Sequence, residues 1–126
     1  MLAPLLIGVV VAVSVLWIRT VIVTGGSMEP VMGPGDVCLV VRGSRVEAGD
    51  IALLRRSGGR PVVHRVLNVA GDGSLVTKGD ANPTPDREAI GPKAVIGRVA
   101  LVVPVGTAAR GWIRATLGAT LLNQSE

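Results

Sequence analysis

The chain has very few aromatic residues. Its 126 residues include no Phe or Tyr, two Trp, one His and one Cys. One cysteine cannot form an internal disulfide, and one Cys with one His is too few for a Cys–His metal site. The net charge is +4, but the aromatic platforms on which nucleic-acid bases stack are missing. We therefore expect a single domain packed by Val, Leu, Ala and Gly, with no nucleic-acid partner, metal or cofactor.

Charged residues are absent from residues 2–18, which are mostly Leu, Val, Ile and Ala. A helix over this run would be roughly 25 Å long, with Trp17 placed as an aromatic belt residue and Arg19 able to snorkel. The pattern predicts a transmembrane anchor over residues 1–19. The alternative is a signal peptide cut near Ala12-Val13-Ser14, but no cationic stretch precedes the run and apolar residues continue beyond the cut.

Residues 20–105 contain short β-rich runs separated by Gly, Pro and Asp. The predicted strands are Val21–Thr24, Val37–Arg42, Ile51–Arg55, Pro61–Val69, Ser74–Lys78 and Ala94–Val103. The Gly71-Asp72-Gly73 turn predicts a hairpin. The expected fold is mainly β, a small coiled antiparallel sheet or partial barrel with an N-terminal transmembrane helix. Residues 106–126 form a tail that we interpret as a helix at a membrane interface.

Two residues are candidates for a nucleophile and its base. Ser27 follows Gly25-Gly26, and such a turn can carry a nucleophile and aim backbone N–H groups at an oxyanion. His64 is the only imidazole, and strand alternation puts it on the same face as Val62 and Val66, where it can act as a general base. The plain alternatives are an ordinary turn serine and a hydrogen-bonded structural histidine.

Two aspartates, Asp80 and Asp86, lie in a loop rich in Gly and Pro after a predicted strand. A carboxylate fixed in such a loop can orient an imidazole N–H. Solvated loop aspartates, with Asp86 paired to Arg87, are the alternative. Lys78 is a further candidate base, because a desolvated lysine can activate a serine, although a surface lysine at a strand end fits equally well.

Together, the ordered segments resemble the type I signal peptidase family, and most closely its serine–histidine branch, found in the endoplasmic reticulum, archaea and some bacteria. They cover roughly residues 20 to 105 and are Gly26-Ser27-Met28-Glu29-Pro30, Gly35-Asp36, Gly49-Asp50-Ile51, Val63-His64-Arg65-Val66, Thr77-Lys78-Gly79-Asp80 with Asn82, and Ile96-Gly97-Arg98-Val99. The bacterial housekeeping branch has a lysine where this chain has His64. The histidine therefore selects the branch.

The resemblance implies a single-pass plasma-membrane protein with a β-rich catalytic domain on the extracytoplasmic face. It assigns Ser27 as nucleophile, His64 as general base, Asp86 as the residue that orients the base, and Asp80 as a supporting acid. The implied substrate is a secretory preprotein, bound extended beside a strand edge at the lipid surface, with small residues at positions −1 and −3 from the cut. No cofactor is implied, and accessory subunits are left open.

One departure from the family concerns the oxyanion hole. Many relatives carry a serine two residues before the nucleophile, where this chain has Gly25, so Thr24 or backbone N–H groups must compensate. Three other functions stay open: a peptidase dedicated to a few precursors, an inactive membrane-anchored peptide-binding module, and a Ser–Lys enzyme that uses Lys78.

Overall fold

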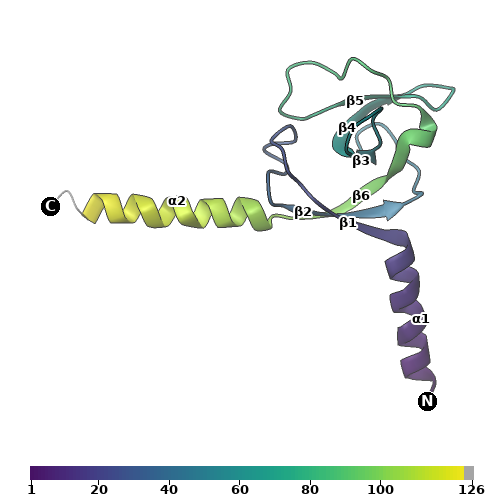
Figure 1. Ribbon diagram of the computed structural model, residues 1–126, viewed down its shortest axis with the longest axis horizontal. Helices are drawn as coiled ribbons and strands as arrows, with labels where there is room; N and C mark the ends of the chain where they lie inside the picture. Colours follow the sequence, from purple (N-terminus) through teal and green to yellow (C-terminus); the bar gives the residue numbers. More distant parts are fainter. Residues whose placement is uncertain (124–126) are drawn as a thin grey trace.

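A computed structural model describes residues 1–123 of the chain (Figure 1). The elements in chain order are α1 (Leu2–Trp17), β1 (Ile18–Ile22), β2 (Val37–Arg42), β3 (Ile51–Leu54), β4 (Val62–Val69), β5 (Leu75–Lys78), the 3-10 turn η1 (Pro92–Ala94), β6 (Val95–Val103) and α2 (Val105–Asn123). The helices lie at the two ends of the chain, and the body between them is β.

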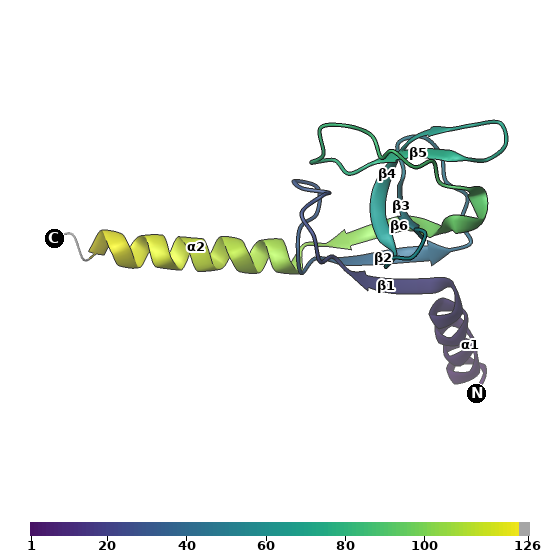
Figure 2. The same cartoon turned by 45° about the horizontal axis from the view of Figure 1, so that its top comes forward.

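The strands form one antiparallel sheet in the order β1-β2-β6-β3-β4-β5. The sheet coils on itself, so that β3, β4 and β5 lie above β1, β2 and β6 (Figure 2). Register shifts in the β2–β6, β3–β6 and β4–β5 pairs support this bending, because a bulge increases local twist. The two edge strands, β1 and β5, do not pair with each other. The mainly β, coiled antiparallel fold is thus confirmed, as is the β4–β5 hairpin.

The interior contains two clusters of buried side chains. The first combines Met28 and Met32 with residues of β2 and β3, and the second combines Val66 and Leu75 with residues of β3 and Ile90. Met28 is 2% exposed, and burying a side chain of this size stabilises the fold by about 1.5–3 kcal/mol. The residue directly after Ser27 is thereby anchored in the core.

The predicted N-terminal membrane anchor is not supported. Helix α1 has 16 residues, a length of about 24 Å against a hydrocarbon core of about 30 Å. Among the residues that the structure describes, no helix combines the length and the hydrophobicity needed to cross a bilayer. The apolar residues that were expected to extend the helix instead form β1, in which Ile18–Ile22 pairs with β2 from Val41 to Val37. Pairing of β-branched residues with a neighbouring strand competes with helix in this segment.

Helix α2 extends away from the sheet (Figures 1 and 2), and its first turn is attached to the loop that follows β1. The buried Asp36 carboxylate accepts hydrogen bonds from the N–H of Gly33 (2.8 Å) and from both the N–H (2.8 Å) and the hydroxyl (2.7 Å) of Thr107. Arg110 donates to the carbonyl of Pro34. The tail is helical as far as Asn123, and its residues 124–126 lie outside the described part of the chain. Its placement at a membrane interface stays a prediction.

Candidate active site

Ser27 lies in the turn that follows β1, where the chain changes direction before β2. The N–H of Glu29 donates to the carbonyl of Gly26, and the N–H groups of Val31 and Met32 donate to the carbonyl of Met28. These turn hydrogen bonds and the buried Met28 side chain fix the backbone on both sides of Ser27, which is itself half-buried. The Ser27 hydroxyl is thus held by a rigid segment.

His64 lies in the middle of β4, paired across the sheet with Ala52 of β3. Its side chain is 8% exposed, on the same buried face as Val66, as the alternation predicts. Its Nε2 is 3.2 Å from the Ser27 Oγ. Two side chains 37 positions apart in the sequence are thus within hydrogen-bonding distance, which is the geometric requirement for a nucleophile and its base.

Asp86 is in contact with the other side of the imidazole. Its Oδ2 is 2.6 Å from His64 Nδ1 and also accepts a hydrogen bond from the Thr77 hydroxyl at 2.8 Å. The N–H of Asp86 donates to the carbonyl of Thr77, which fixes the loop against β5. Burial alone would raise the pKa of Asp86, but the hydrogen bonds from His64 and Thr77 and the nearby charge of Arg56 outweigh it and lower the pKa. Asp86 is therefore ionised at neutral pH.

The three side chains form a continuous line from carboxylate to hydroxyl. An ionised Asp86 can only accept, so His64 Nδ1 carries a proton. In the neutral imidazole, Nε2 then presents its lone pair to the Ser27 hydroxyl. This is the tautomer that a serine nucleophile needs from its base. The arrangement can remove the hydroxyl proton as the oxygen attacks a carbonyl.

Comparison with known protein families gives a match to the Peptidase S24-like family over residues 18–100, about two thirds of the chain. The chain belongs to the Peptidase S24-like family. Membership supports a serine peptidase, a hydrolase of peptide bonds, and the matched span includes Ser27, His64, Asp80 and Asp86. It does not separate the signal peptidase branch from other members, among which are self-cleaving peptidases. A search of curated proteins found no match.

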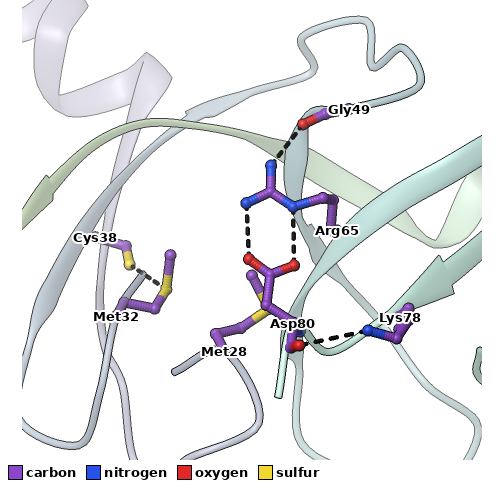
Figure 3. A network of polar contacts seen from close by, with 7 residues as sticks. All are labelled: Met28, Met32, Cys38, Gly49, Arg65, Lys78 and Asp80. Carbon is purple, nitrogen blue, oxygen red and sulfur yellow. Dashed lines mark hydrogen bonds and ion pairs between the residues drawn. The ribbon is translucent and has the colours of Figure 1, made fainter. Parts of the chain in front are cut away.

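Asp80 of this S24-like domain does not contact the imidazole in the structure. Its carboxylate accepts two hydrogen bonds from the guanidinium of Arg65, from Nε at 2.8 Å and Nη2 at 2.7 Å, and Arg65 also donates to the carbonyl of Gly49 (Figure 3). The hydrogen bonds from Arg65 lower the pKa of Asp80. The pair fixes the start of the turn after β5, which contacts Ser27 through the hydrogen bond from the N–H of Ala81 to the Ser27 carbonyl (2.8 Å).

Lys78 has its polar contact elsewhere in this S24-like domain. Its Nζ is 3.4 Å from the backbone carbonyl of Asp80 (Figure 3), while the Ser27 hydroxyl faces His64. The geometry therefore favours the Ser–His arrangement over the Ser–Lys alternative.

Thr77 and Arg56 reach Asp86 but were not identified from the sequence. Thr77 is fully buried at the end of β5, and Arg56 Nη2 is 2.8 Å from Asp86 Oδ2. Thr77 stands in the Thr77-Lys78-Gly79-Asp80 segment, so the resemblance contained a signal for it. Arg56 lies in a polar turn with no distinguishing pattern, and only the folded structure brings it to the site.

A small cleft adjoins Ser27 in the S24-like domain. Its volume is about 170 Å³, and it is lined by residues 21–25 at the end of β1, residues 61–63 at the start of β4, Ser27 and Met28. Val, Ile, Gly and Pro dominate this lining, so the cleft suits a small apolar side chain.

Proposed function

We propose that this protein is a membrane-associated serine endopeptidase that removes N-terminal signal peptides from secretory precursors. The observation that carries the proposal is the Ser27–His64–Asp86 contact line beside a small apolar cleft. The S24-like family supplies the serine peptidase class. The resemblance of the ordered sequence segments to the signal peptidase family supports the narrower assignment to that branch.

In the proposed mechanism, Ser27 Oγ attacks the scissile carbonyl while His64 Nε2 takes its proton. The imidazolium then gives that proton to the leaving amine, and an ester to Ser27 remains. Water hydrolyses the ester with His64 again acting as base, which regenerates the Ser27 hydroxyl. Asp86 holds the imidazole tautomer and stabilises the imidazolium. Because Gly25 offers no side-chain donor, we assign the oxyanion contacts to backbone N–H groups of the Ser27 turn.

The proposed substrate is an extended peptide that adds to the open edge of β1. β1 pairs with β2 on one side only, and strand addition would satisfy the peptide's backbone groups. Alternate side chains of the bound peptide would then face the cleft beside Ser27. A cleft of about 170 Å³ lined by Val and Gly supports a preference for small residues at −1 and −3.

The proposed location is the extracytoplasmic surface of the plasma membrane, where the cleavage sites of precursors lie. Every residue of α1 is exposed, and its sixteen residues carry no charge. Such an exposed apolar surface is typical of a site that contacts lipid or another protein, and we assign it to lipid. Contact would hold the enzyme and its substrate in the same thin layer and raise their effective concentration.

The test is co-expression with a precursor that carries an Ala-x-Ala site. We expect the wild type and the control Ser74→Ala, in the β4–β5 turn, to process the precursor, and Ser27→Ala and His64→Ala not to. Undiminished processing by both active-site variants would remove the assignment. If the wild type cuts its own chain and leaves the precursor intact, a self-cleaving S24-like peptidase takes its place. If the wild type cuts neither its own chain nor the precursor, the inactive peptide-binding module replaces the proposed function.

The breadth of the substrate set needs a second measurement. A peptidase dedicated to a few precursors and a general signal peptidase share every residue described above. Comparing the proteins secreted with and without the gene separates them, because loss of a general enzyme causes many precursors to accumulate.

A further inference from the structure

The turn after β3 contacts the loop that carries Asp86. Arg56 Nη2 lies 2.8 Å from Asp86 Oδ2, and one residue later the Ser57 hydroxyl donates to Glu88 at 3.2 Å. Two adjacent residues of one turn therefore contact two residues of the other loop. These two contacts place the Arg56 guanidinium beside Asp86, on the side of the Ser27–His64–Asp86 series that is farthest from the serine hydroxyl.

A single oxygen of Asp86 has three partners. His64 Nδ1, Thr77 Oγ1 and Arg56 Nη2 are all within 2.8 Å of Oδ2. The first two are hydrogen bonds. The third is an ion pair that lacks the geometry of a hydrogen bond. Both Nε and Nη2 of Arg56 are buried, and neither has a hydrogen-bond acceptor among the described residues. Arg56 therefore acts on Asp86 mainly through its charge.

The charge of Arg56 also acts on the imidazole. Arg56 and His64 approach the same oxygen, so a protonated His64 would place a second positive charge beside the guanidinium. The Arg56 charge opposes the imidazolium and weakens its stabilisation by Asp86, which favours neutral His64.

We propose that Arg56 is a positioning residue whose charge, placed on the Asp86 oxygen that also contacts His64, disfavours the imidazolium form and so leaves Nε2 able to accept the Ser27 proton. The proposal rests on the proposed function for its catalytic meaning. Its physical part, the effect of a guanidinium on the imidazole through a shared carboxylate oxygen, can be measured without substrate.

The other charged groups near His64 belong to the turn after β5 and to β4 and β5. Asp80 lies close enough for the imidazole to contribute weakly to its lowered pKa. Asp80 is already paired with Arg65, and the Lys78 ammonium contacts the Asp80 carbonyl. These charges stay the same in an Arg56 variant, so a change measured there reports on Arg56.

The experiment follows the single imidazole signal by NMR as pH is varied, since His64 is the only histidine. The variants are Arg56→Gln and Arg56→Met, which remove the charge, and Arg56→Lys, which keeps it. Arg55→Gln is the matched control, because it removes the same charge from the exposed neighbouring residue. We expect both neutral Arg56 variants to move the midpoint of the imidazole titration upward by about one pH unit. Arg56→Lys and Arg55→Gln should stay near the wild-type midpoint.

An unchanged or lowered midpoint in the neutral Arg56 variant that retains the wild-type fold would overturn the proposal. So would an equal shift in Arg55→Gln. Precursor cleavage measured in parallel keeps the two proposals separate. If the imidazole shifts as expected but the wild type cuts no precursor, the signal peptidase assignment fails and the role of Arg56 toward His64 stands. If the precursor is cut but the imidazole midpoint does not move, the role of Arg56 fails and the signal peptidase assignment stands. With both intact, the acid limb of kcat/KM should move upward with the NMR midpoint.

Discussion

Gly79 lies directly against the backbone of Ser27, and Gly79→Ala is expected to disturb catalysis without touching a reacting group. A Cβ at position 79 would be 2.6 Å from the Ser27 carbonyl oxygen, 2.7 Å from Asn82 Nδ2 and 3.0 Å from Ser27 Cβ. The amide of Asn82 can move away. The Ser27 carbonyl can move only together with the turn, because it accepts the N–H of Ala81 at 2.8 Å.

The size of the effect follows from these distances. Carbon and oxygen atoms that do not share a hydrogen bond rarely approach within about 3.2 Å, so Ser27 or the turn must move by roughly 0.6 Å. A movement of this size away from the ring takes the Ser27–His64 contact, now 3.2 Å, beyond hydrogen-bonding distance. A shift approaching 1 Å can cost about 10²-fold in rate. We therefore expect kcat/KM to fall by about 10- to 100-fold and stability to fall by about 1–3 kcal/mol.

The assay compares precursor cleavage and thermal unfolding for Gly79→Ala and Gly71→Ala. Gly71 is the matched control, because an added Cβ there meets nothing within 4 Å. The control should retain wild-type kcat/KM. Cleavage by Gly79→Ala within twofold of the wild type would refute the reasoning that the turn after β5 positions the nucleophile.

Three further predictions concern the aspartates that the fold holds ionised. Asp36→Asn replaces a buried carboxylate that accepts three hydrogen bonds. It should therefore lower the free energy of unfolding, measured in urea, by about 2 kcal/mol. The control Asp50→Asn, at a carboxylate with one exposed hydrogen bond, should lower it by much less. In a double-mutant cycle, Arg65→Gln and Asp80→Asn should show a coupling of only about 1 kcal/mol, because both side chains are partly exposed; strictly additive losses would contradict the pairing. The pKa values of Asp36, Asp80 and Asp86 are all lowered from 3.8. Each therefore adds stability that is fully present above about pH 5 and is lost as the pH falls through the lowered folded values. The urea concentration at the midpoint of unfolding, measured from pH 7 down to pH 2, should decrease once the pH is below about 4. A midpoint concentration that stays constant over this range would contradict the lowered pKa values.

Most of the sheet could be predicted because its signals are local. Alternating apolar residues and Gly- or Pro-rich turns placed five of the six strands within one residue or so at each end, as in β2 (Val37–Arg42) and β6 (Val95–Val103). β1 was expected at Val21–Thr24 but forms at Ile18–Ile22. Its position is set by pairing with β2, and an apolar run alone does not distinguish a helix continuation from an edge strand. The same ambiguity made the apolar residues after Arg19 look like an extension of an N-terminal helix that is by itself a little short for a membrane.

The site was predictable to the extent that its residues lie in segments with chemical character. Ser27, His64 and Asp86 were named from the sequence, and the fold brings them into contact; their catalytic roles stay predictions. The ion-pair partner of Asp80 could not be predicted from the sequence. Arg65 lies on the opposite face of β4 from His64, and it contacts Asp80 only because β5 folds back antiparallel to β4. Arg56 depends on a contact between two loops 30 positions apart in the chain, which no local pattern encodes.

The measurement that tests the central claim most directly is the rate at which a fluorophosphonate probe labels Ser27, located by mass spectrometry. The account predicts that the wild type is labelled at Ser27 alone and that His64→Ala and Asp86→Asn each slow labelling by about 100-fold or more. It also predicts that the double variant reacts no more slowly than His64→Ala, because the two residues act as one unit. Labelling of Ser27 at an undiminished rate in His64→Ala would contradict the account.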